Sequence, residues 1–255
     1  MAQTMTRATT PASAAKIAGR RVNRDRWFYL IAASLMLIFT VGGFRNFYLH
    51  GKAPWGDMTA RILPLVIAHG LAMSGWVILF FVQSALIQTG RRKLHLLLGP
   101  LGGVLAGAIV ILGSAVAPFS VRFSPQVYSD LGGPKPFLAS MFVQMLSFGA
   151  FVAIGLVYRR KPEIHRPMML LATIVIQSGA FGRFPYIQKL AVPPMYVWGP
   201  VLLFGALLLV LQWGMNRSLN RSYMMGYAGM VVASLLAIAV GRTALWNSIA
   251  SVFVP

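Results

Sequence analysis

Seven long apolar runs, separated by short polar segments, form the dominant pattern of the chain. The runs cover residues 27–47, 61–89, 95–117, 137–158, 167–185, 196–215 and 223–245. Each is near the roughly 20 residues that a helix needs to cross a hydrocarbon layer about 30 Å thick. No segment alternates between apolar and polar residues as barrel strands do, and a helix satisfies its own backbone in lipid. The pattern therefore predicts an all-α, polytopic membrane protein with a seven-helix transmembrane bundle.

The segment before the first run has a different character. Residues 1–25 are rich in Thr, Ala and Arg and contain no apolar core, which argues against a secretory signal peptide. We interpret this segment as a disordered basic cytoplasmic tail, and residues 26–255 as the seven-span transmembrane domain. An acid-poor leader that carries Arg and Thr is also typical of a mitochondrial transit peptide, which is the alternative for this segment.

Positive charge is unevenly distributed between the two sides of the predicted membrane. The chain has 23 Lys and Arg residues against 4 Asp and Glu residues. If the tail is inside, 15 of the cations lie on the inner side and 8 on the outer side. Cytoplasmic loops carry the excess of Lys and Arg, so the predicted topology is N-in/C-out. The net charge of +19 is expected to serve topology and contact with anionic membrane lipids, and nucleic-acid binding is not expected.

Composition excludes several classes of chemistry. Hydrophobic residues make up 57% of the chain and charged residues 11%, whereas about a quarter of a soluble domain is charged. Cys is absent, which excludes disulfides, thiolate metal sites and cysteine nucleophiles. Proton- or sodium-coupled carriers usually keep an ionisable group at mid-membrane. All four acids of this chain lie outside the predicted spans, which argues against a carrier of that class. These acids are Asp25, Asp57, Asp130 and Glu163.

Polar side chains within the runs are expected to face the bundle interior, because their exposure to lipid is costly. His69, Gln144 and Gln177, on three different runs, fall at one depth in the outer half of the membrane. Four arginines are close to the outer helix ends above them: Arg45, Arg61, Arg183 and Arg242. If these faces converge, they form a cationic mouth over a hydrogen-bonding floor, which suits a lipidic or quinone-like ligand. His69 is then the hydrogen-bonding partner, the glutamines orient the ligand, and Arg183 and Arg242 attract its head group.

A structural interpretation of the same residues stays open. A Gln within a span often bonds a neighbouring helix, and an Arg near a helix end often extends to lipid phosphates. A structural subunit of a larger membrane complex is one alternative function of the chain.

Two further histidines open the third and fifth runs. His95 and His165 each follow a basic turn, at 91–93 and 159–161, so the two hairpins form a weak internal repeat. Both are expected at the cytoplasmic interface, where two imidazoles from different helices could ligate haem iron or a divalent metal. A b-type haem electron-transfer protein is therefore a second alternative function. Interfacial caps or phosphate contacts are the structural alternative for this pair.

Several motifs resemble those of an uncharacterised family of bacterial multi-pass inner-membrane proteins. They are His69-Gly70, the segment from Gln83 through Gly90-Arg91-Arg92-Lys93-Leu94-His95, His165-Arg166-Pro167-Met168-Met169-Leu170, and the regions around Arg183 and Trp246. The resemblance covers most of the chain after the tail and implies a bacterial inner-membrane location, without an activity to carry over. A looser likeness is to small haem-bearing membrane cytochromes, from which the chain departs by lacking two intramembrane histidines at each of two depths.

The sequence thus predicts a non-enzymatic protein of the bacterial cytoplasmic membrane that binds a small amphiphilic ligand in its outer half. The sequence does not indicate catalysis. Because Cys and intramembrane acids are absent, any general base would have to be His69, His95 or His165. No nucleophile, base and orienting residue can be recognised together from their spacing. Ligand identity and oligomeric state are left open.

Overall fold

The computed structural model describes residues 11–50, 63–123, 133–184, 186–187 and 196–254. The helices in chain order are α1 (Pro11–His50), α2 (Leu63–Gln88), α3 (Arg92–Phe123), α5 (Pro134–Val157), α6 (Pro162–Val175), α7 (Ser178–Phe181), α9 (Trp198–Asn216), α10 (Arg221–Gly241) and α11 (Ala244–Ala250). No strand occurs among the described residues, so the predicted all-α class is confirmed for this part of the chain.

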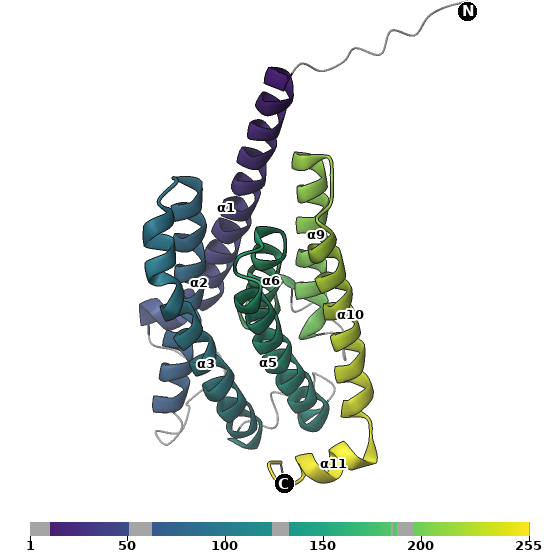
Figure 1. The fold of residues 1–255 in the computed structure, drawn as a ribbon. Coiled ribbons are helices and arrows are strands. Elements are labelled where there is room, and N and C mark those ends of the chain that lie inside the picture. The colour runs from purple at the N-terminus through teal and green to yellow at the C-terminus, as the bar shows by residue number, and fades with distance from the viewer. Residues whose placement is uncertain (1–10, 51–62, 124–132, 185, 188–195, 255) are drawn as a thin grey trace, which may run out of the picture.

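The long helices form an antiparallel bundle, with the start of α1 at one end and α11 at the other (Figure 1). Within the described residues, six helices are long and apolar enough to cross a membrane. They are Asn23–His50 within α1, α2, Arg92–Arg122 within α3, α5, α9 and α10. The chain is therefore a multi-pass membrane protein by length and composition of its helices. The short turns after α2, α5 and α9 all lie at the end of the bundle from which α1 enters (Figure 1).

The predicted fifth span, 167–185, is not one continuous helix. The first part of this segment belongs to α6, which has 14 residues, and the second to α7, which has four. The residues between them, Ile176 and Gln177, have backbone angles near φ −80° and ψ −5°, which end the regular hydrogen-bond ladder. The prediction of seven equivalent membrane-crossing helices is therefore corrected to six long helices and one interrupted segment.

The basic segment that precedes the first apolar run also differs from its prediction. Helix α1 begins at Pro11 and continues without interruption into the first span. Proline is favoured at the first position of a helix, and the Ala, Lys and Arg residues that follow are good helix formers. Of the expected disordered tail 1–25, residues 11–25 are thus helical, and residues 1–10 lie outside the described residues.

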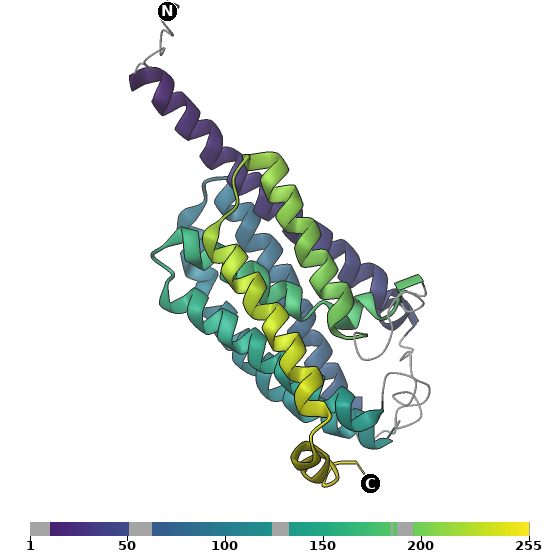
Figure 2. The same cartoon turned by 90° about the vertical axis from the view of Figure 1, so that its right-hand side faces the viewer.

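The interrupted segment forms the centre of the bundle. Residues 170–177 are buried in succession, because α6 packs against α5 and α10 and also contacts α1, α2 and α9. Phe39 of α1 forms edge-to-face contacts with Phe181 of α7 and Phe204 of α9, at centroid distances of 5.2 and 5.7 Å. Figure 2 shows α9 and α10 covering one side of the bundle, with α11 across the end away from the N-terminus.

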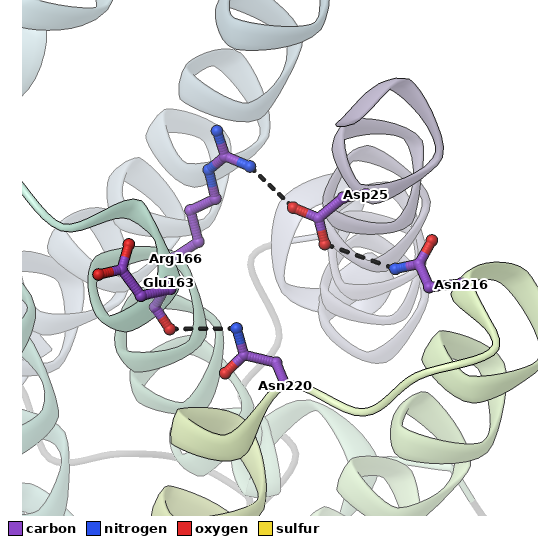
Figure 3. Close-up of polar contacts among 5 residues, drawn as sticks. All are labelled: Asp25, Glu163, Arg166, Asn216 and Asn220. Atoms are coloured by element: carbon purple, nitrogen blue, oxygen red, sulfur yellow. Dashed lines mark hydrogen bonds and ion pairs between the residues drawn. The ribbon is translucent and has the colours of Figure 1, made fainter. Parts of the chain in front are cut away.

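Polar contacts join three helices at the N-terminal end of the bundle (Figure 3). Arg166 of α6 forms an ion pair of 2.8 Å with Asp25 of α1, and the Asn216 amide of α9 lies 3.5 Å from the other oxygen of Asp25. Asn220 donates to the Glu163 carbonyl at 3.1 Å and also caps the start of α10. These contacts fix the depth of α6 relative to α1 and α9, and hence the position of the break that follows.

Candidate functional site

A cavity of about 250 Å³ lies at the level of the break between α6 and α7. Its walls come from the end of α1, the first turns of α2, the last turns of α3, the first half of α5, and residues 176–183. Since α1 and α3 end there, and α2 and α5 begin there, the cavity occupies the half of the bundle that the sequence assigns to the outer side. Of the five predicted ligand-binding residues, His69, Gln144, Gln177 and Arg183 line it.

His69 projects from α2 toward α3. A Cβ atom placed on Gly113 of α3 would lie 3.2 Å from the imidazole Cε1, so the ring occupies the space that the missing side chain leaves. The Nδ1 atom is buried and has no hydrogen-bond partner among the described residues. An imidazole with an unpartnered nitrogen at a cavity wall is a hydrogen-bonding group that a polar molecule in the cavity can satisfy.

Gln144 of α5 stabilises the helix break directly. Its amide nitrogen donates to the Val175 carbonyl at 2.7 Å and to the Ser178 hydroxyl at 2.8 Å, and that hydroxyl lies 3.0 Å from the Gln144 amide oxygen. The side chain is 2% exposed. Because the break removes the intrahelical partner of the Val175 carbonyl, the glutamine replaces that partner from a neighbouring helix.

Gln177 lies within the break and is bound to α1. Thr40 donates to the Gln177 amide oxygen at 3.1 Å, and the amide nitrogen donates to the Met36 carbonyl at 3.3 Å. Both glutamines therefore form interhelical hydrogen bonds, as their structural interpretation expects. Thr40 and Ser178 were not among the predicted residues, because short hydroxyl side chains are common in spans and only their partners distinguish them.

Arg183 follows α7 on a turn at the cavity wall. Its guanidinium donates to the Gly179 carbonyl and lies over the Phe44 ring, with its central carbon 3.9 Å from the ring centroid. This cation–π contact holds the positive charge beside the cavity rather than in bulk solvent.

Arg242, the fifth predicted residue, is not among the residues that line the cavity. It caps the C-terminus of α10, is exposed, and connects that helix to α11. Arg45 does not line the cavity either, and Arg61 lies outside the described residues. Of the four arginines expected to form a cationic mouth, Arg183 is therefore the one placed at the cavity, and α10 with Arg242 packs against α5 and α6 on another side of the bundle.

The second predicted pair, His95 and His165, is brought together at the other end of the bundle. The two rings lie edge to face, with centroids 6.4 Å apart. His95 and His165 are each the fourth residue of their helices, α3 and α6, and α5 lies between these helices in the chain. The two predicted sites, the cavity with His69 and the histidine pair, therefore lie at different ends of the bundle.

No protein-family model, curated protein or solved structure matches the chain.

Proposed function

We propose that this multi-pass membrane protein binds a lipidic or quinone-like amphiphile, with the polar head of the ligand in the cavity beside His69. The observation that carries the proposal is the buried, unpartnered Nδ1 of that histidine at the wall of a cavity of about 250 Å³. Binding pockets for small molecules usually measure about 300–1,000 Å³. The cavity therefore suits a head group or a single ring, and the acyl or isoprenoid tail extends along apolar walls.

The chemistry of the walls supports an amphiphile over a fully polar solute. Apolar and aromatic side chains face the cavity from four helices: Phe44, Phe47, Met73, Val116 and Met141. The two glutamine amides already have protein partners, whereas the buried Nδ1 of His69 has none among the described residues, so His69 is the group that we assign to the ligand head. A mostly apolar site with one or two placed polar groups is typical of sites for lipidic molecules.

The proposal places the N-terminal end of the bundle in the bacterial cytoplasm and the cavity in the periplasmic half of the inner membrane. Support comes from the basic residues of the turns after α2, α5 and α9, which all lie at the N-terminal end. Cytoplasmic loops carry such an excess.

Replacing His69 by leucine is expected to lower retention of a short-chain ubiquinone by up to about tenfold, because one hydrogen bond contributes about 0.5–1.5 kcal/mol. Quinone that co-purifies with the full chain in mild detergent is measured by mass spectrometry. His50→Leu, the same substitution at the exposed end of α1, serves as the control and should retain the wild-type amount. Equal retention by all three proteins contradicts the proposal.

Arg183→Gln distinguishes the charge of the head group. Removing a charge held beside the cavity is expected to weaken an anionic phospholipid several-fold and to leave a neutral quinone unchanged. Competition between phosphatidylglycerol and the short-chain ubiquinone for the purified protein measures this difference. Loss of both ligands in equal proportion would indicate that Arg183 acts on the fold through Gly179 and Phe44 alone.

A further inference from the structure

The spacing of the histidine pair fits a metal ion between the two rings. A bond from a metal to an imidazole nitrogen is about 2 Å long. Two imidazoles that bind one metal from opposite sides therefore have ring centres about 6 Å apart. The observed centroid separation of His95 and His165 is 6.4 Å. The rings come from α3 and α6, two helices that both pack against α5.

The hydrogen bond of His165 fixes which nitrogen is free. Its Nδ1 lies 2.8 Å from the Gly155 carbonyl oxygen. A carbonyl oxygen only accepts, so Nδ1 carries the hydrogen, and in the neutral ring Nε2 keeps its lone pair. Metal-ligating histidines usually donate their other ring nitrogen to a carbonyl or carboxylate in this way. His165 is therefore oriented and in the tautomer that a ligand requires.

His95 offers a nitrogen without a protein partner. Its Nδ1 is buried and makes no hydrogen bond to any described residue. The Gln83 amide nitrogen donates to the His95 carbonyl at 3.2 Å, and the amide oxygen of the same glutamine is also buried without a partner in the described part of the chain. The ring nitrogen of His95 and the amide oxygen of Gln83 are thus two buried polar atoms without a partner among the described residues, and such atoms are rarely left unpaired in proteins.

The surroundings select the kind of metal centre. The described residues hold no group of three or more His, Cys, Asp or Glu side chains, whereas structural zinc requires four ligands. The charged side chains that act electrostatically on His95 are Arg92 and Arg166, and Arg166 is paired with Asp25. A positive environment without a carboxylate ligand disfavours a bare divalent ion. It is compatible with a monovalent ion that accepts two nitrogen ligands, and with haem iron, which needs two axial ligands.

We propose that His95 and His165 together ligate one metal centre, each through one imidazole nitrogen. The centre is either Cu⁺ held by the two imidazoles or the iron of a haem held by the same two groups. Cu⁺ and haem iron would be bound by the same two imidazoles, and the two arms of the experiment distinguish between them. The proposal is independent of the cavity, since neither histidine lines it.

The experiment compares matched variants of the full chain, purified in mild detergent with an affinity tag that contains no histidine. His95→Leu removes the ligand atom, whereas His95→Met has a similar volume and supplies a thioether, which ligates both Cu⁺ and haem iron. His165→Leu tests the second ligand, and His50→Leu at the far end of α1 is the control. The copper arm titrates anaerobic Cu⁺ against a chromogenic chelator, and the haem arm records the visible spectrum before and after addition of haem.

One Cu⁺ per chain, or a Soret band of a six-coordinate haem, is expected for the wild type and for His50→Leu. Both leucine variants should bind the centre more than about 100-fold more weakly, because a direct ligand contributes more than an outer-shell partner, whose loss costs about 10–100-fold. His95→Met should retain binding. Affinity that is equal in the wild type and both leucine variants overturns the proposal, as does loss in His95→Met to the level of His95→Leu. If His95→Leu does not fold, His165→Leu decides by the same criteria.

Discussion

Replacing Gln144 by leucine is expected to lower the free energy of unfolding by about 2–3 kcal/mol, because a buried acceptor left without its partner costs about 1–3 kcal/mol. The substitution removes the donor to the Val175 carbonyl and to the Ser178 hydroxyl, in a position that is 2% exposed. Among the described side chains, Gln144 is the donor to this carbonyl, so the substitution leaves the carbonyl oxygen without that partner. Unfolding of the full chain by SDS in mixed micelles, followed by circular dichroism, measures the change.

Gln88→Leu is the matched control, because Gln88 at the end of α2 forms one hydrogen bond, of 3.4 Å, to Asn23. Its effect is expected within about 0.5 kcal/mol, as for surface substitutions. If the two variants lose stability equally, the helix break does not depend on Gln144. Retention of bound quinone in a folded Gln144→Leu protein would further indicate that the glutamine supports the break rather than contacts the ligand.

Gly43→Leu is expected to have an effect of similar or larger size, about 3 kcal/mol, which is the upper range for overpacking. Gly43 of α1 faces α7, and a Cβ atom there would lie 2.5 Å from the Ala180 carbonyl oxygen and 3.0 Å from its Cα. Both contacts are to backbone, so no side-chain rotation relieves them, and α7 has to move away from α1. The same SDS titration measures the loss, and the ubiquinone assay should report a disturbed cavity.

The control for this variant is Gly214→Leu, at an exposed position of α9 where a Cβ meets nothing within 4 Å. Leucine has a higher helix propensity than glycine by somewhat less than 1 kcal/mol, so this protein should be as stable as the wild type or slightly more stable. Destabilisation by both substitutions would show that steric contact with α7 is not the cause.

The six long helices were predicted from the sequence at nearly the positions where the structure has them. The predicted runs 27–47, 61–89, 95–117, 137–158, 196–215 and 223–245 correspond to α1, α2, α3, α5, α9 and α10. This agreement has a simple physical basis, because an apolar segment of membrane-spanning length must satisfy its backbone internally, and only a helix does so locally. Most helix ends differ from the predicted ends by a few residues, and α1 begins at Pro11 rather than at 27, since polar flanking residues can continue a helix.

The helix break has no comparable signal in the local sequence. The run 167–185 contains a Gln-Ser-Gly sequence at 177–179 that interrupts its apolar residues, but these three residues alone do not specify where a helix ends. The break is stabilised by Gln144 from α5 and Thr40 from α1, which are 31 and 137 residues from their partners Val175 and Gln177. Pairing over such separations depends on which helices become neighbours, and hydrophobic periodicity does not specify that choice.

For the candidate site residues, too, the sequence predicted one part of their position and not the other. Counting residues along each run placed His69, Gln144 and Gln177 at one depth, because a helix rises by a fixed 1.5 Å per residue. Depth does not determine direction around the bundle axis, which is why Arg242, at the expected level, lies away from the cavity. The proximity of His95 and His165 has two causes. Both hairpins turn at the same end of the bundle, as the basic turns indicated. In addition, α3 and α6 both pack against α5, which the basic turns did not indicate.

The sequence by itself therefore determined the membrane class, the all-helical fold and the axial level of each polar group, since these depend on composition and on a constant rise per residue. Tertiary structure decided the interrupted segment at the centre, the partners of the glutamines, and which of the polar groups share a cavity. Those features depend on rotation and contact between helices far apart in the chain, and many sequences with the same apolar pattern would satisfy the membrane equally well.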